Sequence, residues 1–182
     1  LDDISYTFPF GQSIGILGRN GQGKTTLMQI IGGREYPDSG RVVRNATVSW
    51  PIGYGGAMHM ELTGKQNIRF ISRIYGVSFK DIFDYVVDFA DIGKYIDMPV
   101  RTYSAGMKAK IAFALSFAME FNFYLVDEAT STGDMFFRNK CKKAFDERKE
   151  RSTLIMVSHN INTIKEHCDT ACVLDNGKLL LF

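Results

Sequence analysis

One eight-residue segment limits the fold of this chain more than any other feature. Gly18–Thr25 has the sequence Gly-Arg-Asn-Gly-Gln-Gly-Lys-Thr and fits the pattern G-x-x-x-x-G-K-[ST]. It follows the short apolar run Ser13–Leu17 and leads into Thr25–Ile31, whose apolar residues recur at helical spacing. Its glycines permit positive φ angles, so backbone N–H groups can close around phosphate oxygens at the positive end of a helix. The segment predicts a strand, a phosphate-binding loop and a helix in direct succession.

The residues of this loop have distinct expected roles. We expect Lys24 to hold the β- and γ-phosphates of ATP, the Thr25 hydroxyl to ligate Mg²⁺, and Thr26 to add a phosphate contact. An incidental glycine-rich turn is the alternative, but the flanking strand and helix patterns argue against it. ATP and Mg²⁺ are therefore the expected cofactors. The other expected phosphate-binding positions are Gly18, Arg19, Asn20, Gly21, Gln22 and Gly23.

A second apolar run, Phe123–Val126, ends in the acidic pair Asp127 and Glu128. Ligands of open α/β sheets bind at the carboxyl ends of strands, so both acids should lie near the phosphate loop. We expect Asp127 to hold Mg²⁺ through water and Glu128 to act as the general base for the attacking water. His159 follows the expected strand Thr153–Val157 and could contact the γ-phosphate and orient water. A capping or core histidine is the alternative for His159.

The rest of the chain alternates between strand and helix patterns. Further strands are expected at Arg41–Arg44, Thr153–Val157, Ala171–Leu174 and, after an Asn176-Gly177 hairpin turn, Leu179–Phe182. Further helices are expected at Lys65–Tyr75, Lys80–Ala90, Ser104–Met119, Phe136–Glu150 and Ile161–His167. We predict an α/β P-loop NTPase with a mostly parallel sheet flanked by helices, and a helical subdomain inserted at about residues 60–117. We expect residues 1–182 to form a single domain, as a fragment that lacks the first strand and the C-terminal end.

Composition argues against several classes of protein. The net charge is +2, from 22 basic and 20 acidic residues, which is too balanced for a dedicated nucleic-acid binder, so we expect no nucleic-acid partner. No apolar run approaches the length that a bilayer requires, so a role at a membrane would depend on a partner. The three cysteines are expected to be reduced, buried thiols.

The segment Tyr103–Met107, Tyr-Ser-Ala-Gly-Met, resembles the Leu-Ser-Gly-Gly-Gln signature of ABC transporter ATPases. Together with the phosphate loop, the Asp-Glu strand end and His159, it makes the chain similar to the nucleotide-binding subunits of that family. The resemblance implies that Ser104 and Gly106 bind the γ-phosphate held by a second copy, in an ATP-sandwich homodimer, with Asp134 in a loop across the interface. It also implies an integral membrane permease partner and a peripheral location at the cytoplasmic face of the bacterial inner membrane.

Two further segments, residues 49–53 and 61–67, resemble the ATPases that export bacterial capsular polysaccharide. This resemblance implies that ATP hydrolysis powers export of a surface polysaccharide, with O-antigen and teichoic acid exporters as close neighbours. The alternatives are a soluble ABC-type ATPase without a permease, a small-molecule kinase, and a non-catalytic nucleotide-binding module. The transported polymer and the permease are not encoded in these patterns.

His59 departs from the family pattern. Counting back from Leu62-Thr63-Gly64, it stands where the family usually has glutamine, in the loop Gly53–Thr63 that matches the one sensing the membrane partner. Neutral imidazole nitrogen is a poor ligand for Mg²⁺. We hypothesise that His59 contacts the γ-phosphate or the attacking water through an N–H and leaves Mg²⁺ to Thr25 and Asp127. The alternative is a solvated loop residue, with the register shifted by one or two positions.

Overall fold

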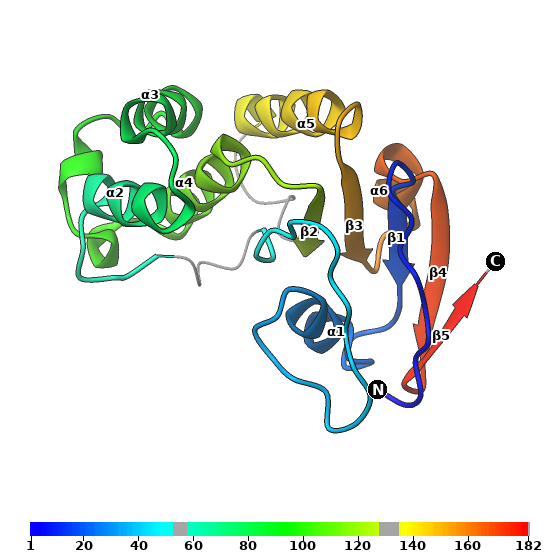
Figure 1. Cartoon of the computed structure of the whole chain (residues 1–182). Coiled ribbons are helices and arrows are strands. Elements are labelled where there is room, and N and C mark those ends of the chain that lie inside the picture. Colours follow the sequence, from blue (N-terminus) through cyan, green and yellow to red (C-terminus); the bar gives the residue numbers. More distant parts are fainter. Residues whose placement is uncertain (53–57, 128–134, 182) are drawn as a thin grey trace. The chain divides into compact units, whose positions relative to one another are not determined.

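The computed structural model describes residues 1–52, 58–127 and 135–181 (Figure 1). It divides into two compact units. The sheet unit comprises Leu1–Ile52, Phe121–Thr130 and Lys142–Phe182, and the helical unit comprises Gly53–Glu120 and Ser131–Cys141. Among the described residues, no helix is long and apolar enough to cross a bilayer.

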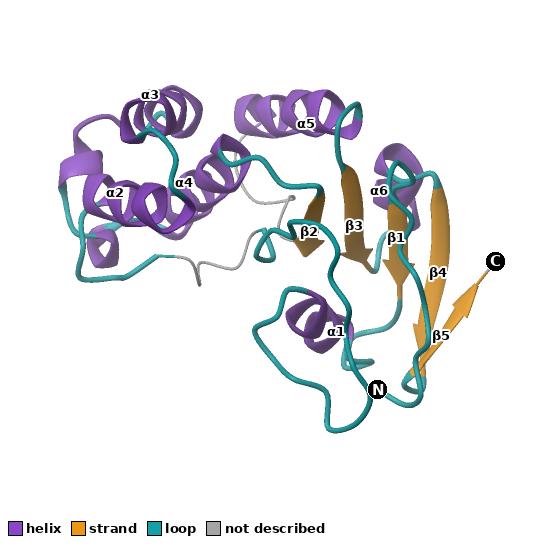
Figure 2. Cartoon of the chain, in the orientation of Figure 1, coloured by secondary structure: helices purple, strands orange, loops and turns teal. Residues whose placement is uncertain are grey.

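Within its described residues, the sheet unit contains a five-stranded sheet in the order β2-β3-β1-β4-β5. Strands β1 to β4 are parallel, whereas β5 runs antiparallel to β4 (Figure 2). The expected hairpin turn between β4 and β5 has positive φ angles of 46° at Asn176 and 78° at Gly177, as a type I′ turn requires. The strands are β1 (Ile14–Leu17), β2 (Phe123–Asp127), β3 (Thr153–Ser158), β4 (Thr170–Asp175) and β5 (Lys178–Leu181). The helices are α1 (Lys24–Ile31), α6 (Ile161–His167) and the last part of α5 (Met135–Lys149).

Helices α1 and α6 lie on opposite sides of the sheet (Figure 1). Alternation of side chains along β1 explains both contacts. Ile14 and Ile16 join a buried cluster with residues of α1, whereas Gly15 faces α6. A Cβ at Gly15 would collide with the side chain of Ile164, so glycine allows α6 to pack closely. The cluster on the α1 side consists of Ile14, Ile16, Leu27, Met28, Ile31, Leu125, Ile155, Val157, Cys172 and Leu174.

The helical unit is the inserted helical subdomain that the sequence predicts. Its N-terminal caps agree with the sequence, since Thr63 and Gln66 form a capping box on α2 and Ser78 caps α3. Aromatic rings fill its core: Phe113 and Phe117 stack with ring centroids 4.6 Å apart, and Phe137 meets Phe113 edge-on at 5.8 Å. The helices are α2 (Gly64–Tyr75), α3 (Phe79–Ala90), α4 (Ala105–Ala118) and the first part of α5, with 3₁₀ turns η2 (Gly93–Asp97) and η3 (Val100–Thr102).

One predicted strand is wrong. Residues Arg41–Arg44 form no strand and are exposed. The Arg44 guanidinium instead donates hydrogen bonds to the carbonyl oxygens of Ile30 and Ile31, at 2.5 and 2.7 Å. These carbonyls lie in the last turn of α1, and that of Ile30 also accepts a hydrogen bond from the Gly33 N–H at 3.2 Å. The segment thus closes a helix terminus, and its two β-branched valines do not pair with the sheet.

Candidate nucleotide-binding site

The loop between β1 and α1 has a backbone suited to binding an anion. Gly21 and Gly23 adopt positive φ angles of 82° and 93°, the conformation in which successive N–H groups can form a concave nest. Gly18 has a different reason to be glycine, since a Cβ there would lie 2.7 Å from the Leu174 carbonyl oxygen. Helix α1 begins at Lys24 and points its positive end at the loop.

Lys24 lies inside the loop to which it belongs. Its side chain is buried, at 8% exposure, and its ammonium donates hydrogen bonds to the carbonyl oxygens of Gly18 and Arg19 at 2.6 and 2.9 Å. The Gln22 side chain accepts a hydrogen bond from the Asn176 N–H at 2.8 Å and ties the loop to the β4–β5 turn. A fixed cation beside oriented N–H groups fits a polyphosphate.

Thr25 and Asp127 come together from α1 and the end of β2. The Thr25 hydroxyl donates a hydrogen bond to the Asp127 carboxylate at 3.3 Å. Burial raises the pKa of Asp127, while this hydrogen bond and the positive charge of Lys24 act in the opposite direction. Two oxygen ligands of this kind fit Mg²⁺, which prefers hard oxygen donors and keeps several other ligands.

The strand register brings the carboxyl ends of β1, β2 and β3 to the same edge of the sheet. Leu17 of β1 pairs with Ser158 of β3, and Asp127 of β2 pairs with Val157, so the three carboxyl ends lie side by side. His159 follows Ser158 directly and is exposed at this edge. The sheet unit therefore brings together the phosphate loop, Asp127 and His159. Thr26, the residue after Thr25 on α1, is exposed. The predicted base Glu128 and the predicted interface residue Asp134 lie outside the described residues.

The segment resembling the ABC signature lies in the helical unit. Ser104 caps α4, and its hydroxyl accepts a hydrogen bond from the Met107 N–H at 3.2 Å. Gly106 is exposed, and the nearest atom that a Cβ there would meet is the Ser104 hydroxyl oxygen at 3.9 Å. The packing around Gly106 therefore leaves room for a side chain and does not itself require glycine.

His59 also lies in the helical unit and is exposed. Its Nδ1 accepts a hydrogen bond from the Glu61 N–H at 3.3 Å, and its main chain is bound by the side chain of Asn67. The sequence reasoning missed Asn67. The feature of the sequence that could have identified it is an amide side chain on the apolar face of an amphipathic helix, beside Ile68 and Ile71. His59, Ser104 and Gly106 thus belong to one unit, and the phosphate loop, Asp127 and His159 to the other.

The chain is similar to known proteins in sequence and in fold. The family profile described as "ABC transporter" matches residues 1–131. The polysialic acid transport ATP-binding protein KpsT of Escherichia coli is 44% identical over 180 residues, which cover 98% of this chain and 80% of KpsT. The capsule polysaccharide export ATP-binding protein CtrD of Neisseria meningitidis serogroup B is 46% identical over 183 residues, covering 100% and 84%.

Among solved structures, a dimeric ATP-binding cassette, MJ0796, bound to ADP and Pi, superimposes with a TM-score of 0.80. The match covers 96% of this chain and 85% of that one at 18% sequence identity, so it bears on the fold alone. The predicted α/β fold with a mostly parallel sheet is confirmed.

Proposed function

Because this chain belongs to the ABC transporter family and is an ATPase of that family, we propose that it hydrolyses MgATP to power export of a capsule-type surface polysaccharide through a partner permease. The observation that carries the chemistry is the buried Lys24 ammonium inside a positive-φ glycine loop, beside the paired oxygens of Thr25 and Asp127. The names of the similar proteins support the cargo, because KpsT is described as a polysialic acid transport ATP-binding protein and CtrD as a capsule polysaccharide export ATP-binding protein.

In this proposal, the sheet unit binds the triphosphate of ATP. Backbone N–H groups of residues 18–23 and the Lys24 ammonium hold the phosphate oxygens, and Thr26 adds a hydroxyl contact. Thr25 and Asp127 would hold Mg²⁺, which neutralises phosphate charge when bound. On binding, the Lys24 ammonium would exchange the loop carbonyl oxygens that it contacts for phosphate oxygens.

Hydrolysis requires that a water oxygen form a bond to the γ-phosphorus while the bond to the ADP oxygen breaks. Glu128 follows Asp127 directly in the sequence and is proposed to accept the proton of that water as general base. His159, at the carboxyl edge of β3, is proposed to contact the γ-phosphate and orient the water. The His59 N–H is proposed to contact the γ-phosphate or the water.

The proposed assembly contains two copies of this chain and a permease. Ser104 and the Gly106 amide, at the N-terminus of α4, would bind the γ-phosphate held by the second copy. Two ATP molecules are then buried between the copies, and hydrolysis lets the copies part. The permease would place the protein at the cytoplasmic face of the bacterial inner membrane as a peripheral subunit.

A chromosomal Lys24→Ala allele tests the proposed function in the cell. The polysaccharide should accumulate inside the cell while its synthesis continues, because the ATP-dependent step alone is lost. Lys178→Ala, a change of an exposed lysine in the β4–β5 hairpin, is the matched control and should export normally. Normal surface capsule in the Lys24→Ala strain would refute the export role. Loss of O-antigen or teichoic acid with intact capsule would assign a different polymer.

A further inference from the structure

Asn67 is a polar residue on the buried face of helix α2. Its exposure is 0%, and it lies on the buried face of the helix with Ile68 and Ile71, whose exposures are 0% and 5%. Burying an amide costs free energy unless its hydrogen bonds are made inside the protein. The partners of this side chain therefore indicate what it does.

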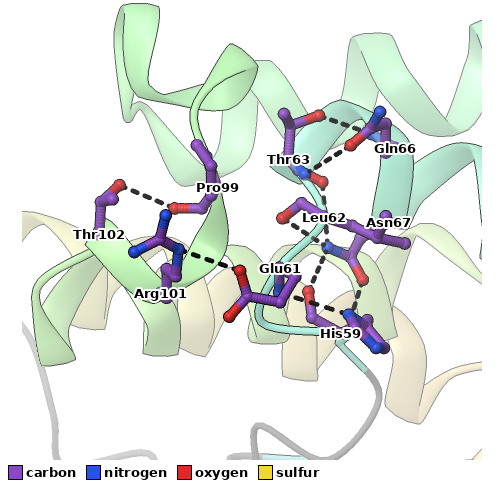
Figure 3. Close-up of polar contacts among 9 residues, drawn as sticks. All are labelled: His59, Glu61, Leu62, Thr63, Gln66, Asn67, Pro99, Arg101 and Thr102. Atoms are coloured by element: carbon purple, nitrogen blue, oxygen red, sulfur yellow. Dashed lines mark hydrogen bonds and ion pairs between the residues drawn. The ribbon is translucent and has the colours of Figure 1, made fainter.

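Within the described part of the chain, the Asn67 amide bonds to the loop His59–Thr63 (Figure 3). Its Oδ1 accepts a hydrogen bond from the His59 N–H at 2.7 Å, and its Nδ2 donates to the His59 carbonyl oxygen at 3.0 Å. Nδ2 also lies within hydrogen-bonding distance of the carbonyl oxygens of Leu62, at 3.3 Å, and Thr63, at 3.0 Å. One amide thus binds both main-chain polar groups of His59 and joins them to the start of α2.

These hydrogen bonds hold the main chain from which the His59 ring extends. With the main chain held, the Glu61 N–H reaches His59 Nδ1 at 3.3 Å and occupies its lone pair. In the neutral ring, the proton then resides on Nε2. Because the side chain is exposed, it offers an N–H donor outward from the loop. A donor suits a phosphate or water oxygen, whereas a metal ion would need the lone pair.

The other end of the loop is also held by bonds that do not involve Asn67. The N–H groups of Val100 and Arg101 donate to the carbonyl oxygens of Leu62 and Met60, both at 2.9 Å. The Arg101 guanidinium also pairs with Glu61 at 3.1 Å (Figure 3). Loss of the Asn67 amide should therefore loosen the His59 end, which keeps a hydrogen bond from the Leu62 N–H to the His59 carbonyl oxygen at 3.3 Å, while these bonds to residues 100–101 keep the rest of the loop in place.

We propose that Asn67 is a positioning residue for His59: its buried amide fixes the His59 main chain so that the ring presents its Nε2–H to the γ-phosphate or the attacking water. The inference rests on the proposed function of His59 in ATP hydrolysis. The positioning itself concerns this chain alone and can be measured without nucleotide.

The first test reads the ring directly in the intact protein. The sequence contains three histidines, so the ring signals can be assigned by replacing each in turn. Long-range ¹H–¹⁵N NMR under mildly alkaline conditions reports which nitrogen carries the proton. We expect the Nε2–H form alone in the wild type and a mixture of tautomers in Asn67→Asp, whose second carboxylate oxygen would face the loop carbonyls. Ser72→Ala, which removes another buried polar group of α2, should leave the ring unchanged.

Asn67→Ser provides a second variant in case Asn67→Asp folds poorly, because a small neutral hydroxyl introduces no buried charge. It should also shift the tautomer ratio. An unchanged ring in a folded Asn67 variant would overturn the proposal.

The second test asks whether Asn67 acts through His59. Asn67→Asp should lower the kcat for ATP by roughly 10- to 100-fold through misplacement of the ring. In the His59→Ala background, the same change should cost less than about twofold, the usual error of additivity. An equal loss in both backgrounds would make Asn67 merely structural and overturn the proposal. If the His59 tautomer changes in the Asn67 variants while His59→Ala keeps normal ATP turnover, the positioning by Asn67 is supported. In that case His59 has no part in the proposed catalysis.

Discussion

In the sheet unit, Lys24 and Asp127 owe their positions to the backbone: one begins a helix after a glycine loop, and the other ends a strand. In the helical unit, His59 owes its position to a side chain, because the amide of Asn67 binds its N–H and its carbonyl oxygen. The first arrangement is encoded by neighbouring residues in the chain. The second depends on a contact between a loop and a buried helix face. Substitutions should therefore act differently in the two units.

The largest effect is expected from Lys24→Ala. This change removes the fixed cation of the phosphate loop while the glycine backbone stays, so binding of ATP should weaken and kcat should fall by about 10²–10³-fold or more. Steady-state ATPase assays measure it, with Lys178→Ala as the control for a lost surface charge. Unchanged turnover in Lys24→Ala would contradict the role of the sheet unit.

Substitutions of two glycines, one in each unit, distinguish a role in packing from a role in ATP turnover. Gly15→Ala should lower the free energy of unfolding by about 1–3 kcal/mol, because its methyl group collides with Ile164. Gly106→Ala should leave stability unchanged or raise it by up to about 1 kcal/mol, since it lies in the first turn of α4 with open space around it. ATP turnover should nevertheless fall roughly tenfold or more if a phosphate approaches there. Denaturation and ATPase assays on both variants measure these effects. Full ATPase activity in Gly106→Ala would contradict a role for the signature segment in binding phosphate.

Asp127→Asn should reveal the cost of a buried carboxylate. Burial raises the pKa of Asp127 above its unfolded value, so its contribution to stability is complete below the unfolded pKa and is lost as pH rises through the folded pKa. Without nucleotide, the stability of the wild type should therefore fall relative to Asp127→Asn between acidic and neutral pH. Adding MgATP should stabilise the wild type more than the variant. Parallel pH profiles, or equal gains with MgATP, would contradict this role of the carboxylate.

The smallest effect is expected at the Lys149–Asp169 pair, whose charged atoms lie 2.9 Å apart at the surface. The hydrogen bond from Lys149 lowers the pKa of Asp169, so its stabilising contribution is present above the unfolded pKa and is lost as pH falls through the folded pKa. Lys149→Met should cost about 0.2–1 kcal/mol near neutral pH and nothing in strong acid. Lys143→Met, which removes the more exposed partner of Glu147 at 3.8 Å, is the control. A loss independent of pH would contradict the assignment.

The contrast between the units also explains what the sequence could predict. The strand, loop and helix around Gly18–Thr25 follow from adjacent residues, and their observed bounds differ from the prediction by one residue. Arg41–Arg44 was mispredicted because its valines suit a strand, while the competing attraction of Arg44 for the end of α1 depends on tertiary structure. The same limit hid Asn67, whose partners become apparent only when the loop is folded.

Among the candidate site residues, the predicted meeting of Thr25 with Asp127 relied on a rule that the chain obeys locally: parallel strands end at one edge. No comparable rule brings His59 or Ser104 to that edge from the helical unit. Their roles at the phosphate, and that of Glu128 as base, remain predictions, because they depend on a nucleotide and on a second copy of the chain.

The most direct test of this account is the molecular mass of Glu128→Gln by light scattering, with and without MgATP. With hydrolysis blocked, we expect a dimer with MgATP and a monomer without it. Adding Ser104→Arg should abolish the dimer while each monomer still binds ATP through its own phosphate loop. Ser78→Arg, which removes the cap of α3, controls for the loss of a helix cap and should leave the dimer intact. A dimer that persists with Ser104→Arg would contradict the claim that the signature of one copy completes the ATP site of the other.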